Sequence, residues 1–543
     1  MKAPSEKGKR DAVNLDFEEM LPALTWLGEV AATLCAGAAF ALLLRLSGGK
    51  WTWAPLGASA AAGIGLLAGL EPLPLPVGFV LSSSVVAFAA SWRAPSRGGA
   101  KRERERARVG PIKVIHRALV LRYRRSRRVR GDRLALGRTA ELGLVEIPFG
   151  GERGCHGLVL GATDSGKTVT AAAIAQATVR AGNAVIAIDP KGDRDLESLL
   201  AGEAELAGVP FWAWSPSGPC AYNVARRGGP SEVADKVLSG HDWSEPHYLS
   251  IALRFVQREV EVLNACGIDV TLGSLARYMH SERLESLAGR SGRATEERVE
   301  LLTKDLPKRM LDDLAGARSR VALLAESEFG AWLGCGEESA QEIDLASVIR
   351  SRGVAYFRLE SDRYEQLGRL LATSLIVDLV TLSADLQGGR LRALLMIDEF
   401  ASIAADQVSR LFATARGAGL SALLISQGMA DLRAASDNGA AETLAAQVVQ
   451  NVAYVLAHRQ TDPDAREFLA RISGTYETWA LAEQVEGEVL KRRTGDGSRF
   501  PTHEFQVHPN EFKTLGQGSA IVIEAGRERS SERVRVWAPQ RRD

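Results

Sequence analysis

Apolar residues follow three different patterns along the chain. Near the amino terminus, residues 30–46, 52–70 and 77–92 are almost wholly apolar, and each approaches the ~20 residues that a membrane-spanning helix needs. Within residues 227–340, apolar residues recur at steps of three and four, which predicts amphipathic helices. Elsewhere, short runs such as "AVIAID" at 184–189 are typical of buried parallel strands.

The amino-terminal segments predict a multi-pass membrane anchor. Trp51 and Trp92 lie at their ends, where interfacial aromatic residues are found. Sixteen Lys and Arg residues against three acids follow between Arg93 and Arg133, although the whole chain has a net charge of only +1. Basic residues beside a span stay cytoplasmic, so we expect the rest of the chain on the cytoplasmic side of the inner membrane. Two or three spans fit this pattern, and a buried soluble helical hairpin is the alternative.

The second half of the basic block, residues 122–133, leaves three interpretations open. It can bind anionic lipid headgroups beside the membrane. It can contact nucleic-acid phosphates. It can also be a solvated linker.

Cysteine and histidine patterns predict no structural zinc site. The five cysteines form no CxxC pair, and the eight histidines show no metal-ligand spacing. We expect free thiols in a reducing compartment.

Residues 161–168 read "GATDSGKT", the pattern of a phosphate-binding loop. An apolar strand at 158–160 precedes the loop, and an alanine-rich helix at 168–179 follows it. Backbone N–H groups of such a loop hold the phosphates, Lys167 adds positive charge, and Thr168 supplies a hydroxyl for Mg²⁺. We therefore predict that ATP binds Gly161, Ala162, Thr163, Asp164, Ser165, Gly166, Lys167 and Thr168.

Asp164 is an acidic residue where a triphosphate should bind. The backbone does most of the binding in such a loop, so side chains at its middle positions can point away from the ligand. We expect Asp164 to weaken ATP affinity without abolishing it.

A pair of acids ends a second apolar strand, in the sequence "LLMIDE" at 394–399. Beside a phosphate loop, Asp398 is expected to hold Mg²⁺ and Glu399 to polarise the attacking water. Further on, residues 409–427 predict a helix, a glycine turn and a strand. Gln427 closes that strand, where it can sense the γ-phosphate, and Arg416 ends the helix, where it can reach a neighbouring subunit.

Lys167 and Asp398 are separated by 231 residues, more than a compact P-loop sheet needs. We therefore predict an α/β P-loop NTPase domain interrupted by an all-α insert and preceded by transmembrane helices. The expected divisions are 1–92 for the membrane region, 93–135 for a basic linker, 136–226 and 341–543 for the nucleotide-binding domain, and 227–340 for the insert.

These features together resemble the type IV coupling proteins, the TraG/TraD-type membrane ATPases of conjugation and type IV secretion. The resemblance is carried by the amino-terminal spans, the helical insert, "GATDSGKT" with "DPKGD" after it, "IDEFASIA", "ARGAGLSALLISQ" and "NVAYVLAHRQTDPDAREFLARISG". It covers about 150–543 and the membrane architecture. That family usually has Gly-Ser at the loop centre, where this chain has Asp164-Ser165.

The resemblance implies a RecA-like fold, ATP and Mg²⁺ as ligands, and a homo-hexamer with a central channel. Its expected partners are DNA, a relaxase or other DNA-processing protein, and a membrane secretion channel. Lys167, Thr168, Asp398 and Glu399 match the ATPase core. Arg416 matches an arginine finger that acts across the ring, Gln427 matches the sensor, and Arg459 matches a second contact across the ring more weakly. The insert is a candidate for recognising the DNA-processing complex, or a lid that stiffens the ring.

Two other functions fit parts of the sequence. An FtsK-type translocase of double-stranded DNA is related by fold, although no helix-turn-helix module is predicted after residue 510. A membrane receptor that recruits protein substrates, with ATP controlling its assembly, is the other. The intact Asp398-Glu399 pair argues against a role without hydrolysis.

Overall fold

The computed structural model describes residues 111–150, 153–239, 246–305, 308–334, 341–385, 391–400, 411–412, 415–429, 441–486, 492–526 and 531–540. The chain divides into two compact units, residues 1–122 and 123–543, and the described part of the first unit is the beginning of helix α5 (Pro111–Ser126). The expected membrane spans within residues 1–92 lie outside the described residues.

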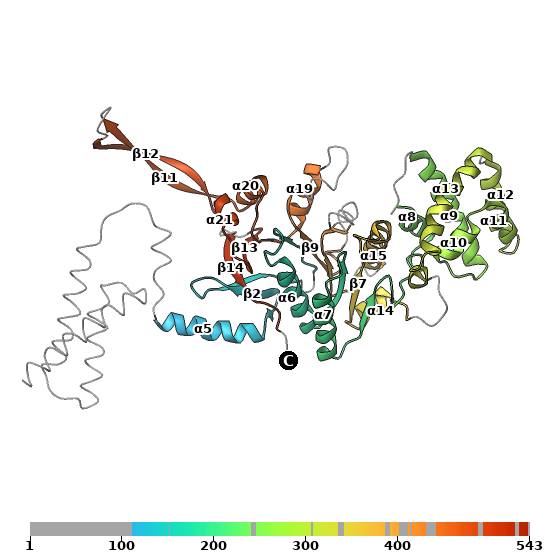
Figure 1. Ribbon diagram of the computed structural model, residues 1–543, viewed down its shortest axis with the longest axis horizontal. Coiled ribbons are helices and arrows are strands. Elements are labelled where there is room, and N and C mark those ends of the chain that lie inside the picture. Colours follow the sequence, from blue (N-terminus) through green and yellow to red (C-terminus); the bar gives the residue numbers. More distant parts are fainter. Residues whose placement is uncertain are drawn as a thin grey trace, which may run out of the picture. The chain divides into compact units, whose positions relative to one another are not determined.

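A mixed sheet of twelve strands forms the centre of the second unit as far as the structure describes it (Figure 1). Its order is β1-β2-β14-β13-β10-β4-β9-β8-β5-β7-β6, with β3 paired to β2. In this order, every neighbouring pair from β10 to β6 is parallel. All other pairs in the sheet are antiparallel. The strands are β1 (Val129–Arg130), β2 (Arg133–Arg138), β3 (Leu144–Pro148), β4 (Gly157–Leu160), β5 (Ala184–Asp189), β6 (Phe211–Trp214), β7 (Val354–Arg358), β8 (Ala393–Ile397), β9 (Leu420–Ser426), β10 (Tyr454–Ala457), β13 (Ser519–Glu524) and β14 (Ser531–Val536).

Helices cover both faces of the parallel strands. Helices α6 (Lys167–Arg180) and α7 (Arg194–Ala207) pack on one face, where Val159 points. Helices α14 (Leu345–Arg350) and α15 (Glu365–Asp385) pack on the other, where Leu158 and Leu160 point. Because both faces are buried, these strands read as continuous apolar runs in the sequence.

Helix α15 is the only described helix that is long and apolar enough to cross a membrane. Its most apolar window is 72% buried inside the protein, as expected for a core helix of a soluble domain. The apolar composition of α15 is therefore explained by its packing against the sheet.

The described chain between β6 and α14 contains helices and no strand. Figure 1 shows these helices gathered together in green and yellow. They are α8 (Pro230–Ser239), α9 (Pro246–Ala265), α10 (Leu272–Tyr278), α11 (Ser281–Ala288), α12 (Arg293–Asp305), α13 (Lys308–Ala325) and the 3-10 helix η2 (Gly330–Leu333).

A buried ion pair attaches α8 to α15. The Lys236 side chain is fully buried, and its Nζ lies 2.6 Å from Asp378 Oδ1. Tyr222 donates its hydroxyl to the other oxygen of Asp378 at 2.5 Å. A buried charge without its partner is strongly destabilising, so these contacts hold the two helices in one arrangement.

The basic stretch that we expected to be a linker up to residue 135 is folded from Pro111 onward, as α5 and the first strands of the sheet. Arg124 pairs with Glu146 of β3. Arg133 pairs with Glu524 of β13 at 2.5 Å. The expectation of a linker was wrong here because these arginines serve as ion-pair partners for the protein's own sheet, which their charge alone could not reveal.

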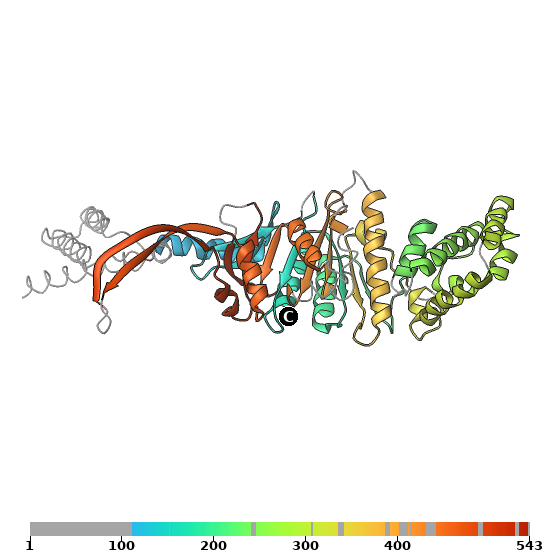
Figure 2. The same cartoon turned by 90° about the horizontal axis from the view of Figure 1, so that it is seen from above.

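The described residues after β9 include further helices and a separate two-stranded ribbon, β11 (Thr475–Glu486) with β12 (Arg492–Phe505) (Figure 2). The sequence did not predict the ribbon. Trp479 on β11 is 65% exposed and Phe500 on β12 is 49% exposed, so these two aromatic side chains face solvent rather than a core. The helices are α19 (Ala441–Asn451), α20 (Pro463–Ile472) and α21 (Pro509–Lys513).

His156, directly before β4, is a buried titratable group in this core. Its Nδ1 accepts a hydrogen bond from Ala422 N at 3.1 Å, which requires an unprotonated ring nitrogen. Burial, followed by the charge of Arg416, lowers the pKa of His156 from 6.5 to about 4. The folded protein therefore keeps this ring neutral at pH values where an unfolded chain would protonate it.

We expect the free energy of unfolding to fall as the pH drops from about 6.5 to about 4. Above this window the ring is neutral in both states, and within it only the unfolded chain takes up the proton. The full loss is at most about 3 kcal/mol. Urea unfolding at several pH values should show a shallower decline for His156→Asn, which keeps an acceptor but does not titrate. Equal declines in both proteins would contradict this assignment.

Candidate nucleotide site

The loop predicted to bind phosphate connects β4 to α6 at the carboxyl edge of the parallel strands. Gly161 begins the loop directly after the buried strand. A Cβ at Gly161 would lie 2.5 Å from Ser165 Oγ and 2.6 Å from His458 Cβ, so only glycine fits there. Gly166, with φ of 103°, precedes α6 in a conformation that L side chains rarely adopt. These two glycines set the path of the loop.

Asp164 has φ of 59°, in the left-handed region that favours glycine. Aspartate is one of the few other residues that tolerate this conformation. The Asp164 side chain is exposed to solvent. An aspartate is therefore compatible with the backbone of the loop at this position.

Lys167 and Thr168 lie in the first turn of α6. The buried Lys167 side chain donates from Nζ to Gly161 O at 2.6 Å and to Ala162 O at 3.4 Å. Its positive charge therefore lies at the loop. Thr168 is half-buried beside it.

The end of β10 supports the loop from one side. His458 donates its backbone N–H to Leu160 O at 2.7 Å, and its Nε2 lies 3.0 Å from Thr170 Oγ1. Burial lowers the pKa of His458 to about 4, which keeps the ring neutral beside Lys167. Ser165 Oγ is buried and has no hydrogen-bond partner among the described residues, so the loop contains a polar atom suited to a ligand.

The acid pair follows β8 at the same edge. Asp398 donates its backbone N–H to Ile188 O at 3.0 Å, and Asp398 Oδ1 accepts from Glu399 N at 3.0 Å. Glu399 has a positive φ of 43°. Burial, followed by the negative charges of Glu399 and Asp189, raises the pKa of Asp398 to about 6. A cation bound here would relieve this repulsion.

Gln427 joins the acid pair to the phosphate loop. It lies directly after β9 and donates from Nε2 to Glu399 Oε1 at 2.9 Å. Its Oε1 lies 3.5 Å from Thr163 Oγ1 in the loop. Lys191 Nζ is also 3.1 Å from Glu399 Oε1. Lys191 and His458 are the site residues that sequence reasoning missed, although Lys191 comes two residues after the predicted strand 184–189 and His458 directly follows the observed strand β10.

Arg416 lies at the opposite edge of the sheet from the phosphate loop. It precedes β9, and its carbonyl accepts a hydrogen bond from Gly154 N, before β4, at 2.9 Å. The seven residues of β9 separate it from Gln427 by about 20 Å. Arg416 is thus not part of its own chain's site.

Arg459 lies next to its own loop, where its carbonyl accepts a hydrogen bond from Ala162 N at 2.9 Å. The expected contact with a neighbouring subunit does not follow from this placement.

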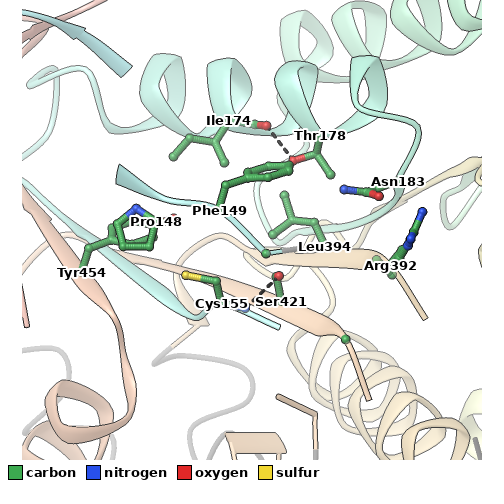
Figure 3. Close-up of a pocket in the computed structure, with 13 residues that line it drawn as sticks. Pro148, Phe149, Cys155, Ile174, Thr178, Asn183, Arg392, Leu394, Ser421 and Tyr454 are labelled. Atoms are coloured by element: carbon green, nitrogen blue, oxygen red, sulfur yellow. Dashed lines mark hydrogen bonds between the residues drawn. The ribbon is translucent and has the colours of Figure 1, made fainter. Parts of the chain in front are cut away.

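A small cavity is present at the edge where Arg416 lies (Figure 3). Its volume of about 20 Å³ suits a water molecule. Cys155, Ser421 and Tyr454, from the amino ends of three strands, contribute to its lining. The cavity is therefore too small for a nucleotide and lies at the wrong edge.

The oxygen atoms of Thr168 and Asp398 are suited to Mg²⁺, which prefers hard oxygen ligands. Across the described residues, no group of three His, Cys, Asp or Glu side chains could hold a metal ion by itself. Magnesium here would need phosphate and water as its remaining ligands, which is its usual mode beside a phosphate loop.

Two family models match parts of the chain. The model for the TraM recognition site of TraD and TraG matches residues 392–504. The helicase HerA-like C-terminal model matches residues 149–204. A search of curated proteins by sequence gives no significant match.

Solved structures of a conjugative coupling protein share the fold. Unbound TrwBdeltaN70 is 17% identical, with a TM-score of 0.55 over 77% of this chain and 91% of its own. TrwB in complex with ADP and Mg²⁺ is 18% identical, with a TM-score of 0.51 over 71% and 86%. TrwB with the non-hydrolysable ATP analogue ADPNP is 16% identical, with a TM-score of 0.52 over 77% and 92%.

At these identities, the likeness shows that the fold is the RecA-like α/β fold of TrwB. The segment that contains the acid pair and Gln427 matches the TraD and TraG model, so this part of the chain is similar to the type IV coupling proteins.

Proposed function

We propose that this protein is a membrane-anchored ATPase that couples ATP hydrolysis to the transfer of DNA, or of DNA with attached protein, in conjugation or type IV secretion. The observation that carries the proposal is the continuous contact from Thr163 through Gln427 to Glu399. This contact links the predicted phosphate loop to the residue placed to activate water. The match of residues 392–504 to the TraD and TraG model supports the transfer role.

ATP with Mg²⁺ is the proposed ligand of the site. The TrwB complexes with ADP and Mg²⁺ and with ADPNP support this assignment. Residues 161–168 would hold the phosphates, and Thr168 and Asp398 would hold Mg²⁺. When bound, Mg²⁺ would supply positive charge that offsets the charge of the phosphates.

Three side chains carry the proposed chemistry. Lys167 stabilises negative charge on the outer phosphates. Glu399 accepts the proton of the attacking water, and Gln427 aligns that water while it contacts the loop through Thr163.

Arg416 is proposed to complete the site of a neighbouring subunit in a homo-hexameric ring. Its place at the far edge of the sheet supports this role, because a head-to-tail ring brings unlike edges of adjacent subunits together. An arginine supplied in this way stabilises charge in the transition state of phosphoryl transfer.

Membrane anchoring and partner binding complete the proposal. The expected spans within residues 1–92 would anchor the ring at the inner membrane beside a secretion channel. DNA would be held mainly through its phosphates. The TraM recognition model over residues 392–504 and the helical segment α8–α13 make these regions the candidates for binding a relaxase or another DNA-processing protein.

A second candidate is an FtsK-type translocase of double-stranded DNA. The HerA-like match over residues 149–204 favours it. The kind of DNA that stimulates hydrolysis distinguishes the two candidates.

DNA should stimulate ATP turnover by the full chain in detergent at concentrations where rings assemble. Single-stranded DNA acting better than duplex would favour a coupling protein, and the reverse would favour a duplex translocase. Lys167→Ala should abolish turnover because it removes the charge on the outer phosphates. The control is Lys304→Ala, on the exposed face of α12. ATP binding without any response to DNA would instead support a membrane receptor whose assembly ATP controls.

Mixing two inactive variants should restore activity if Arg416 acts on a neighbouring subunit. Arg416→Ala keeps an intact loop, and Lys167→Ala keeps an intact arginine. When the two variants are mixed randomly in equal amounts, about one quarter of the interfaces pair an intact Lys167 on one subunit with an intact Arg416 on its neighbour. A mixture of Lys167→Ala with Glu399→Gln should stay inactive, since both changes affect the same side of the interface. Full activity of Arg416→Ala alone would contradict the assignment.

Replacing Asp164 should tighten ATP binding. Asp164→Gly removes a negative charge and places glycine at a position whose backbone is in the left-handed region. We expect about three- to tenfold higher affinity for ATP. Asp164→Asn removes the charge alone, so the difference between the two variants isolates the conformational contribution. Equilibrium binding of a fluorescent ATP analogue measures both. Weaker binding by Asp164→Gly would mean that the carboxylate contributes to the site.

A further inference from the structure

Two donors meet at one oxygen of Glu399. Lys191 Nζ lies 3.1 Å from Glu399 Oε1, and Gln427 Nε2 donates to the same atom at 2.9 Å. These donors come from different strands, because Lys191 follows β5 and Gln427 follows β9. Strand β8, which carries Glu399, lies between those two strands in the sheet. The carboxylate is therefore held from both sides.

The turn that presents Lys191 is fixed by a buried carboxylate. Asp189 is 1% exposed, and its Oδ1 accepts hydrogen bonds from the backbone N–H groups of Lys191 and Gly192, each at 2.9 Å. Its Oδ2 accepts from Asp193 N at 2.6 Å and from the Tyr356 hydroxyl at 2.6 Å. With these four donors on Asp189, the backbone at Lys191 has little freedom.

Both ends of this turn are also anchored. Asp193 caps α7 by accepting from Asp195 N and Leu196 N. At the other end, Ile188 O accepts the backbone N–H of Asp398, which ties the turn to the acid pair. The backbone of the turn is thus rigid, and the Lys191 side chain extends from it to Glu399.

Lys191 is charged in this setting. Burial alone would lower its pKa, but the hydrogen bond and charge of Glu399 outweigh burial and raise it. Its side chain is 52% exposed, so the ion pair adds little to the stability of the fold. The consequence of the contact is the position of the Glu399 carboxylate.

We propose that Lys191 is a positioning residue for Glu399, and that its ammonium group and the Gln427 amide together hold the carboxylate in the orientation needed to take a proton from water. This inference rests on the proposed function, because it assumes that Glu399 is the base. A carboxylate that is misplaced by about 1 Å loses much of its catalytic effect, although ATP binding depends on other residues.

The test compares Lys191→Met, Lys191→Arg and Glu399→Gln in the full chain, measuring kcat, KM and equilibrium binding of ATP. Lys191→Met keeps the aliphatic stem and removes the charge. We expect it to lower kcat about tenfold while KM and ATP binding stay nearly unchanged, which is the pattern of an interaction needed only for the chemical step. Lys191→Arg should recover most of kcat. Lys304→Met is the matched control at an exposed lysine.

Glu399→Gln separates this inference from the proposed function. If Glu399→Gln binds ATP and does not hydrolyse it, Glu399 is the base and the Lys191 variants can be interpreted. The inference is overturned if Lys191→Met has the kcat of the unmodified chain, a higher kcat, or a loss confined to ATP binding. It is also overturned if Lys191→Arg recovers nothing. Normal hydrolysis by Glu399→Gln would overturn both the inference and the catalytic assignment.

Discussion

The common register of the parallel strands is the constraint on which the site depends. Leu160, the last residue of β4, pairs with Ser426 of β9 and with Ala457 of β10. Ile188 of β5 likewise pairs with Ile397 of β8. The phosphate loop, Gln427 and the acid pair therefore leave the sheet at one edge, although they are far apart in the sequence. A shift by one residue in any of these strands would exchange its buried faces and displace the group that follows it.

Segments buried on both faces could be predicted from the sequence, because their apolar residues are continuous and turn residues flank them. Strand β5 was predicted with its observed bounds, and α6 to within one residue at each end. The positions of the loop and of the Asp398-Glu399 pair after buried strands were also predictable, since each is a local motif beside a strand, and their chemistry stays a prediction. Asp164 has a positive φ and an exposed side chain, and its expected effect on ATP affinity stays a prediction.

Features that depend on which strands are neighbours could not be predicted. The contact between Lys191 and Glu399 exists because β5 and β8 are adjacent, and strand order is not encoded in either motif. The edge on which Arg416 lies follows from the direction of β9, which the sequence pattern does not specify. The arginines of the basic block gave the wrong expectation for a related reason, because their acidic partners are distant in sequence.

The buried pair of Lys236 and Asp378 has a mechanical consequence. A force on the helical segment that begins with α8 reaches the sheet in part through this contact with α15. Separating opposite charges in a poorly polarisable interior becomes costly within a few ångströms, whereas apolar side chains can slide past one another. The junction is therefore stiff toward small displacements. If the helical segment carries a load, this stiffness would pass the load to the sheet with little displacement.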